Sequence, residues 1–159
     1  MTTFKDLADS SKVWIYQSDR AFDDRETSGI RSALRNFVQN WTSHGEQLYA
    51  FADVYFQNFI VIMVDQEVAK ATGCAIDKSV AFIKEIERAF EVNLFKRTAI
   101  AYLDKDEIKT TTKRKFLNLI ESGELTLDTI IFNNTVKKKS DFESKWKVKV
   151  KESWLMASV

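Results

Sequence analysis

The sequence predicts an α+β fold with a ferredoxin-like centre, on the basis of three observations. First, residues 47–55 and 58–65 form a hairpin pattern whose second strand is apolar at every position from 59 to 64. Second, amphipathic segments with helical spacing lie on either side of this hairpin in the sequence. Third, aromatic and β-branched residues at 12–17 and 97–103 complete the order β-α-β-β-α-β, the ferredoxin-like signature with both helices on one face of an antiparallel sheet.

The first strand and the first helix are assigned from local patterns. Residues 12–17 alternate and are rich in aromatic and β-branched side chains, which is typical of a strand. Asp23 and Glu26 form a capping-box pattern that opens a helix, and Gly45 is well placed to end it. The apolar positions of this helix recur with helical spacing at Ile30, Ala33, Leu34, Phe37, Val38 and Trp41.

The hairpin requires cover on both faces of its sheet. A strand with one solvated face alternates apolar and polar residues, and residues 59–64 do not. The helices are expected to cover a face formed by Val13, Ile15, Ile60, Ile62 and Val64. The opposite face would carry Trp14, Tyr16, Phe59, Val61 and Met63, more apolar surface than a monomer usually exposes. Three covers for it remain open: the C-terminal residues, a second copy of the chain in a homodimer, or a ligand or nucleic acid.

The second half of the chain completes this pattern and then exceeds it. Asp77 is a plausible N-cap for the second helix, and residues 97–103 form the fourth strand. The whole chain, 1–159, is expected to be a single domain, with a ferredoxin-like core at 12–103 and a C-terminal α/β extension at 104–159 that packs on it. The elements predicted in the extension are a helix at 110–122 and strands at 127–132 and 145–151.

Composition bounds the class of protein. The chain has 159 residues, 45% of them hydrophobic, and a formal net charge of +1. Its apolar runs are far shorter than the roughly 20 residues of a membrane helix, and the first residues carry no apolar signal region, so we expect a cytoplasmic location and no membrane partner. A single cysteine excludes an internal disulfide. Residues 137–151 hold seven lysines against two acids, which indicates either an anionic partner or a solvated lysine edge.

Missing motifs exclude several classes of enzyme. The four glycines lie too far apart for a P-loop or a dinucleotide-binding fingerprint, and the GxSxG pattern of serine hydrolases is absent. One histidine and one cysteine cannot form a zinc site alone. No metal and no cofactor is therefore expected, and the chain is not a P-loop ATPase.

Cys74 is the candidate for catalysis. It is predicted at or just before the start of the second helix, where the helix N-terminus and Lys78 would favour the thiolate. His44, the only histidine, could serve as its base, and the chemistry would be thiol acyl transfer or hydrolysis. The alternative is a small buried residue at a tight junction between loop and helix.

Two further groups of residues are candidates for ligand binding. Asp77, Lys78 and Ser79 lie near the same helix start, where backbone N–H groups attract a phosphate or a carboxylate, although a carboxylate cap would itself satisfy those donors. Trp14 and Tyr16 lie on the predicted aromatic sheet face, the kind of surface on which RNA-recognition motifs stack bases. The glycine of the RNP1 pattern is missing from this hairpin, so a nucleic-acid partner is not expected.

Three cations at residues 113–115 fall near the start predicted for the third helix, which is the unfavourable end of the helix dipole. An anionic partner at this point would explain them. A helix that begins earlier, near Asp104 or Asp106, would remove the misfit, and this second interpretation is favoured.

Several short blocks resemble a family of uncharacterised small bacterial proteins. The blocks are Trp14-Ile15-Tyr16-Gln17, Trp41-Thr42-Ser43-His44-Gly45, residues 73–79, Asn93-Leu94-Phe95, Phe132-Asn133-Asn134 and Ser153-Trp154. The resemblance spans nearly the whole chain and implies no function. Some members of the family carry an ABC transporter ATPase label, which the missing P-loop does not support here.

The sequence therefore indicates a small non-catalytic binding or assembly module that uses its aromatic sheet face. Its partner would be a small ligand, a protein or a second copy of the chain. The alternatives are a cysteine-dependent enzyme centred on Cys74 and a small-anion site at residues 73–79.

Overall fold

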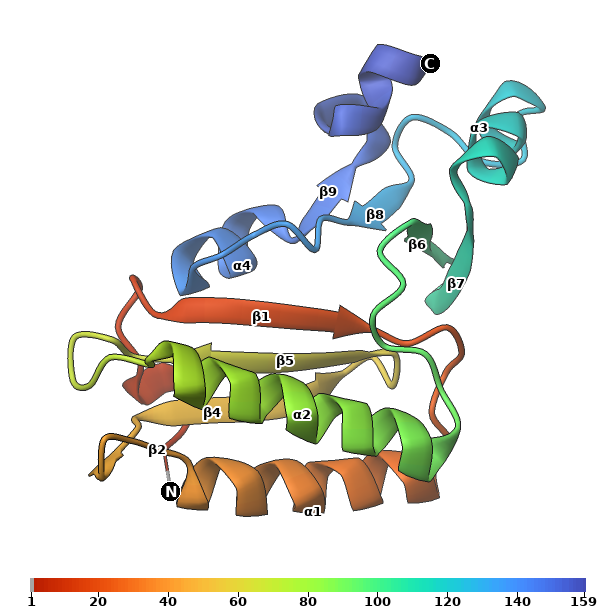
Figure 1. Cartoon of the computed structure of the whole chain (residues 1–159). Helices are drawn as coiled ribbons and strands as arrows, with labels where there is room; N and C mark the ends of the chain where they lie inside the picture. Colours follow the sequence, from red (N-terminus) through yellow and green to blue (C-terminus); the bar gives the residue numbers. More distant parts are fainter. Residues whose placement is uncertain (1) are drawn as a thin grey trace.

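A three-stranded antiparallel sheet forms the centre of the structure, a computed structural model that describes residues 2–159. Strand β5 (Phe59–Val64) lies in the middle, between β1 (Lys12–Gln17) and β4 (Ala50–Tyr55). Helices α1 (Asp24–Asn40) and α2 (Gly73–Phe90) cover one face of this sheet (Figure 1). The predicted α+β class is confirmed.

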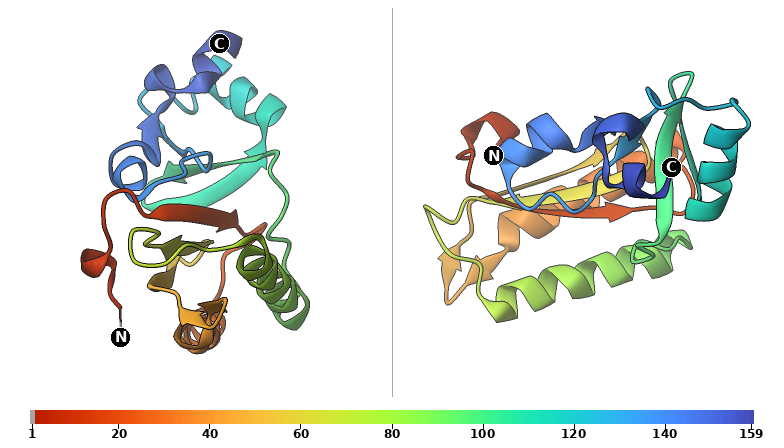
Figure 2. Two further views of the ribbon diagram at one scale, coloured as in Figure 1. Left: turned by 60° about the vertical axis from the view of Figure 1, so that its left-hand side comes forward. Right: turned by 90° about the horizontal axis from the view of Figure 1, so that it is seen from above.

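The C-terminal half of the chain builds a second antiparallel sheet, which is stacked on the other side of the first (Figure 2). Its strand order is β7-β6-β8-β9. The elements are β6 (Ala99–Asp104), β7 (Glu107–Thr112), α3 (Lys113–Glu121), β8 (Ile130–Phe132), α4 (Lys139–Lys145) and β9 (Lys147–Lys149). A small hairpin after α1 consists of β2 (Thr42–Ser43) and β3 (Glu46–Gln47).

The two long helices begin at side-chain caps. Asp23 accepts a hydrogen bond from the Glu26 N–H, and the Glu26 side chain bonds back, so the predicted capping box of α1 is present. The cap of α2 is Thr72 and not Asp77, because the Thr72 hydroxyl accepts from the Ala75 N–H and helical geometry already begins at Gly73. Asp77 therefore lies inside the helix, past its first turn.

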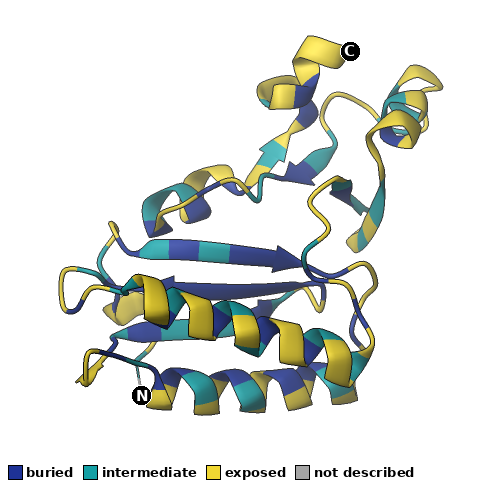
Figure 3. Cartoon of the chain, in the orientation of Figure 1, coloured by how far each residue is buried: buried dark blue, intermediate teal, exposed yellow. Residues whose placement is uncertain are grey.

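Strand β5 is fully buried, as the sequence predicts. Every residue from 59 to 64 has 0% of its surface exposed (Figure 3). Strands β4 and β5 are joined by residues 56–58, in which Phe56 and Gln57 both have φ of 54° and the Asn58 N–H donates to the Tyr55 carbonyl at 3.0 Å. This left-handed turn matches the right-handed twist of the two strands.

The assignment of β1 residues to the two faces was wrong by one position. In the register of β1 and β5, Trp14 pairs with Ile62 and Tyr16 pairs with Ile60, so both aromatic side chains lie on the helix side. Val13 and Ile15 lie on the opposite side. Both sets of alternating β1 side chains are apolar, so the sequence does not show which set faces the helices. A shift of one residue in the register exchanges the two faces.

The second face of the sheet is covered by this chain itself. Phe59 contacts the rings of Phe132 and Trp146 at centroid distances of 4.8 and 5.0 Å, and Phe142 and Val136 join the same apolar cluster. Of the three covers that the sequence left open, the C-terminal residues therefore supply this one. That face is closed to a second copy of the chain.

The full ferredoxin-like strand order is not formed. Three strands have the expected arrangement, but the fourth, β6, lies in the second sheet instead of beside β1. Strand β6 pairs with β7 through the tight turn at Lys105 and Asp106, a local pairing with little loop-closure entropy to overcome. In residues 2–159 the outer edge of β1 forms a main-chain hydrogen bond at one end only, where the Val13 N–H donates to the Lys137 carbonyl at 2.9 Å.

Helix α3 begins at Lys113, with Thr112 as its cap, and has no acid in its first turn. The interpretation that placed its start near Asp104 or Asp106 was wrong, because those residues lie at the turn between β6 and β7. The three cations at 113–115 thus lie on the first helical turn. Within the described residues no helix is both long and apolar enough to cross a membrane.

Candidate ligand-binding groove

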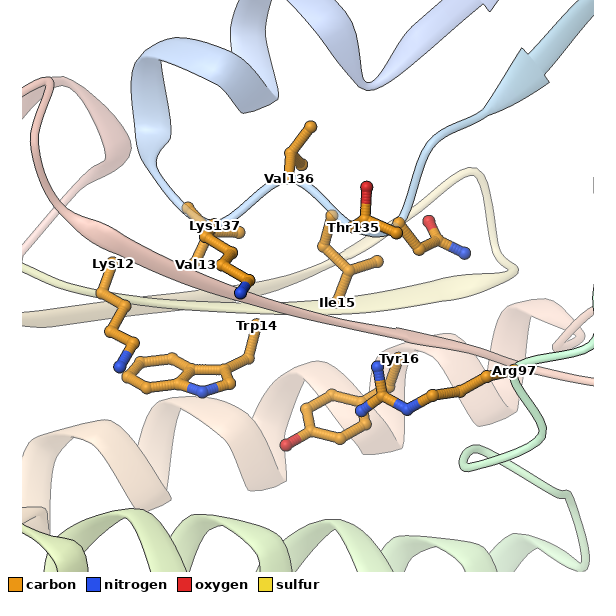
Figure 4. Close-up of a pocket in the computed structure, with 10 residues that line it drawn as sticks. Lys12, Val13, Trp14, Ile15, Tyr16, Arg97, Thr135, Val136 and Lys137 are labelled. Atoms are coloured by element: carbon orange, nitrogen blue, oxygen red, sulfur yellow. The ribbon is translucent and has the colours of Figure 1, made fainter. Parts of the chain in front are cut away.

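A groove of about 390 Å³ runs along the open edge of β1 (Figure 4). Its floor is β1 itself, and its far wall is the segment between β8 and α4. A third side comes from the connection between α2 and β6. The polar and aromatic side chains around it are Lys12, Trp14, Tyr16, Arg97, Asn134, Thr135 and Lys137.

Strand alternation brings the two aromatic side chains to one side of the groove. Trp14 and Tyr16 are two residues apart on β1 and so point in the same direction. Tyr16 is held by an edge-to-face contact with Phe95, with ring centroids 5.4 Å apart. Trp14 is half-buried and carries the Lys12 ammonium 5.3 Å from its ring. The indole thus keeps an accessible surface beside a positive charge.

The groove is positively charged. Lys12, Arg97 and Lys137 line it, and no acidic side chain does so among the residues that the structure describes. None of these three cations forms an ion pair within residues 2–159, whereas six other lysines and arginines do. Burial raises the pKa of the Tyr16 phenol, and the charge of Arg97 acts in the opposite direction. An anion in this groove would therefore meet unpaired positive charge.

Backbone groups of β1 also face the groove. The Val13 N–H points outward to the Lys137 carbonyl, while the Ser18 N–H points inward to Asn58 on the β5 side. Alternation in an antiparallel strand then directs the N–H and C=O of Ile15 outward as well. In the described part of the chain neither group has a partner on that edge. A ligand can therefore form hydrogen bonds to the main chain as well as ion pairs.

The structure places the two residues of the predicted catalytic pair on neighbouring turns. Cys74 is exposed in the first turn of α2, and His44 is exposed in the turn between β2 and β3, with φ of 52°. Their neighbours Ser43 and Thr72 are joined by a hydrogen bond of 2.9 Å, so the two turns are adjacent. No hydrogen bond joins His44 to Cys74 within residues 2–159.

The residues predicted to hold a small anion do not converge. Asp77 and Lys78 are exposed on the second turn of α2. Ser79 is buried, and its hydroxyl donates to the Ile76 carbonyl at 2.6 Å. The hydroxyl and the ammonium that were expected to share one ligand thus point to different environments.

Two of the sequence-predicted ligand residues, Trp14 and Tyr16, do lie together at the groove. Sequence reasoning missed Lys12 on β1 and Arg97 and Asn134 in connecting segments. Lys137 belongs to the lysine-rich residues 137–151, for which an anionic partner was one of two interpretations. The sequence signal that could have indicated Arg97 was the pair of adjacent cations, Lys96 and Arg97, in the short connection between α2 and β6. No sequence pattern indicated that residues 134–137 would lie against β1.

Comparison of the chain with models of protein families, with curated proteins and with solved structures finds no match. In residues 2–159 no group of three or more His, Cys, Asp and Glu side chains lies close enough together to hold a metal ion.

Proposed function

We propose that this protein is a non-catalytic binding protein that holds an anionic ligand with a flat apolar part in the groove beside β1. The observation that carries the proposal is the set of three unpaired cations around two aromatic side chains, in a groove that no acidic side chain of residues 2–159 lines. The function predicted from the sequence is kept, but its site moves from the sheet face, which is covered, to the sheet edge.

The chemistry of the walls defines the class of ligand. Arg97 offers a planar fork of donors that suits a phosphate or a carboxylate, and Lys12 and Lys137 add charge from the other end of the groove. Trp14 offers an indole ring on which a planar group can stack. A nucleoside monophosphate combines these features and is a suitable probe.

The proposal is tested by titrating adenosine monophosphate while recording the amide signal of Ile15 and the indole N–H signal of Trp14. Both signals are expected to shift. The variant Arg97→Ala removes a charge-assisted hydrogen bond worth about 1.5–3 kcal/mol and should weaken binding about tenfold or more. Trp14→Leu should weaken it with the charges intact.

Lys105→Ala is the matched control, because Lys105 lies in the exposed turn between β6 and β7 and does not line the groove. Inorganic phosphate and adenosine, tested separately, show which part of the probe contributes. The proposal is wrong if Ile15 and Trp14 respond to none of the three compounds, or if Lys105→Ala and Arg97→Ala weaken binding equally.

A further inference from the structure

The groove beside β1 is not isolated, because two more hollows continue it. It shares Arg97 and residues 134–135 with a second hollow of about 210 Å³. The second hollow shares residues 98–99 and Lys113 with a third, of about 500 Å³, at the start of α3. The three hollows therefore form one continuous surface from the open edge of β1 to the first turn of α3.

This surface is strongly basic along its whole length. Lys12, Arg97 and Lys137 lie at one end, and Lys96 and residues 113–115 lie at the other. None of these seven cations takes part in an ion pair in the part of the chain that the structure describes.

Acidic side chains are nearly absent from the same surface. Only Asp19 lines any of the three hollows among the described residues. Its carboxylate is engaged, because it accepts a hydrogen bond of 3.0 Å from the Asn93 N–H. A chain with a net charge of +1 has thus collected unpaired positive charge along one path, and such a path attracts a polyanion.

Two indoles accompany the charges. Trp14 lies in the first hollow, and Trp154 lines the second with 51% of its surface exposed. In residues 2–159 no other aromatic ring packs against Trp154. An acidic peptide would use the cations but has no need of half-exposed indole faces, whereas unstacked bases bind to such faces with little dependence on sequence.

We propose that this surface binds single-stranded nucleic acid, with phosphates along the cations and bases against Trp14 and Trp154. The proposal rests on the proposed function, because one nucleotide would occupy the groove beside β1. The sequence predicts no nucleic-acid partner for the sheet face, because the RNP1 pattern is missing there. The surface proposed here lies at the edge of the sheet, so that pattern does not bear on it.

The test measures the anisotropy of a fluorescent single-stranded RNA of about 12 nucleotides, a length within the range of about 4–16 that a single OB-fold occupies. The RNA should bind at least tenfold more tightly than adenosine monophosphate. The double variant Arg114→Ala, Lys115→Ala should weaken RNA binding about tenfold and leave mononucleotide binding unchanged. It should also lower the slope of log affinity against log salt by about 1.4, since each single-strand phosphate contact contributes about 0.7.

The variant Trp154→Leu separates stacking from charge. It should weaken RNA binding about tenfold without altering the salt slope. The control Lys70→Ala, Lys78→Ala removes the same charge from exposed positions outside the three hollows and should leave the affinity within about twofold.

Each failure has a separate meaning. If adenosine monophosphate binds in the groove but the RNA binds no more tightly, the extended surface is wrong and the proposed function stands. If neither the RNA nor any of the three small compounds binds, both are wrong. Equal weakening by the control pair, equally tight binding of a duplex, or displacement of the RNA by equimolar polyglutamate would each overturn a single-stranded nucleic-acid site.

Discussion

The side-chain amide of Asn134 donates a hydrogen bond of 2.8 Å to the side-chain oxygen of Gln17, joining positions 117 residues apart. Asn134 also accepts from the indole N–H of Trp146 at 2.9 Å, and Gln17 donates to the Ala99 carbonyl at 3.3 Å. Strand β1, the start of β6 and the segment after β8 thus meet in one polar network. This network fixes the wall of the groove relative to its floor.

Asn134→Ala is expected to lower the free energy of unfolding by about 2 kcal/mol or more. The buried Gln17 oxygen and the buried Trp146 N–H would both lose a partner, and an orphaned buried polar group costs about 1–3 kcal/mol. Urea unfolding measures the change. Asn118→Ala, at an exposed position of α3, should leave stability unchanged or slightly raised; equal losses in the two variants would contradict the role of Asn134.

Lys139 holds the N-terminal segment against the apolar cluster around Phe59 and Trp146. Its ammonium is buried and donates to the carbonyls of Phe4 and Leu7, each at 2.8 Å. Lys139→Met should lower the free energy of unfolding by about 1–3 kcal/mol and expose residues 2–9 to limited proteolysis. Lys145→Met removes an exposed ion pair with Asp141 and should cost less than about 1 kcal/mol. A Lys139 variant whose N-terminus resists the protease as well as wild type would contradict this role.

Acidic pH should destabilise the start of helix α1, because it protonates the Glu26 carboxylate. The Arg20 guanidinium, and then the Asp23 N–H, lower the pKa of Glu26 from its usual 4.5 to about 2. Because the pKa is depressed in the folded state, this contribution to stability is complete above about pH 4.5 and is lost as the pH falls toward 2. Glu26→Gln should therefore show a smaller fall in unfolding midpoint between pH 5 and 2 than wild type. Parallel pH curves would contradict the assignment.

Cys74 should react with an alkylating reagent in the folded protein at neutral pH, since its side chain is exposed. Reaction in the native state thus reports exposure and does not by itself indicate catalysis. Cys74→Ser should change the free energy of unfolding by less than about 0.5 kcal/mol, as for most exposed positions, and should leave ligand binding at the β1 groove unchanged. Protection of Cys74 from alkylation until unfolding would show that the helix start is covered.

The elements that could be predicted from the sequence are those whose signals are local. The capping box at Asp23 and Glu26 and the continuous apolar run of β5 each identify an element without reference to the rest of the chain. The faces of β1 could not be assigned, because both sets of its side chains are apolar and only the partner strand sets the register. The partner strand of β6 could not be predicted either. The polar and threonine side chains of β7 are equally compatible with the residues that precede a helix.

The candidate site was predicted in part for the same reason. Trp14 and Tyr16 belong to a recognisable strand, so their joint placement followed from its period of two. Arg97 and Lys137 lie in connecting segments that face the groove only after the second sheet has formed. That Arg97 and Lys137 line the same groove depends on tertiary packing, and no local sequence pattern indicates it.

The double burial of β5 has a consequence for synthesis. Phe59, Val61 and Met63 leave the ribosome well before Phe132, Phe142 and Trp146, which cover them. At about 5–20 residues per second, the nascent chain presents an uncovered aromatic sheet for seconds, with its helices already available to pack on the other face. A message truncated after β6 would yield a product in which this face stays uncovered, and exposed apolar surface of this kind promotes aggregation.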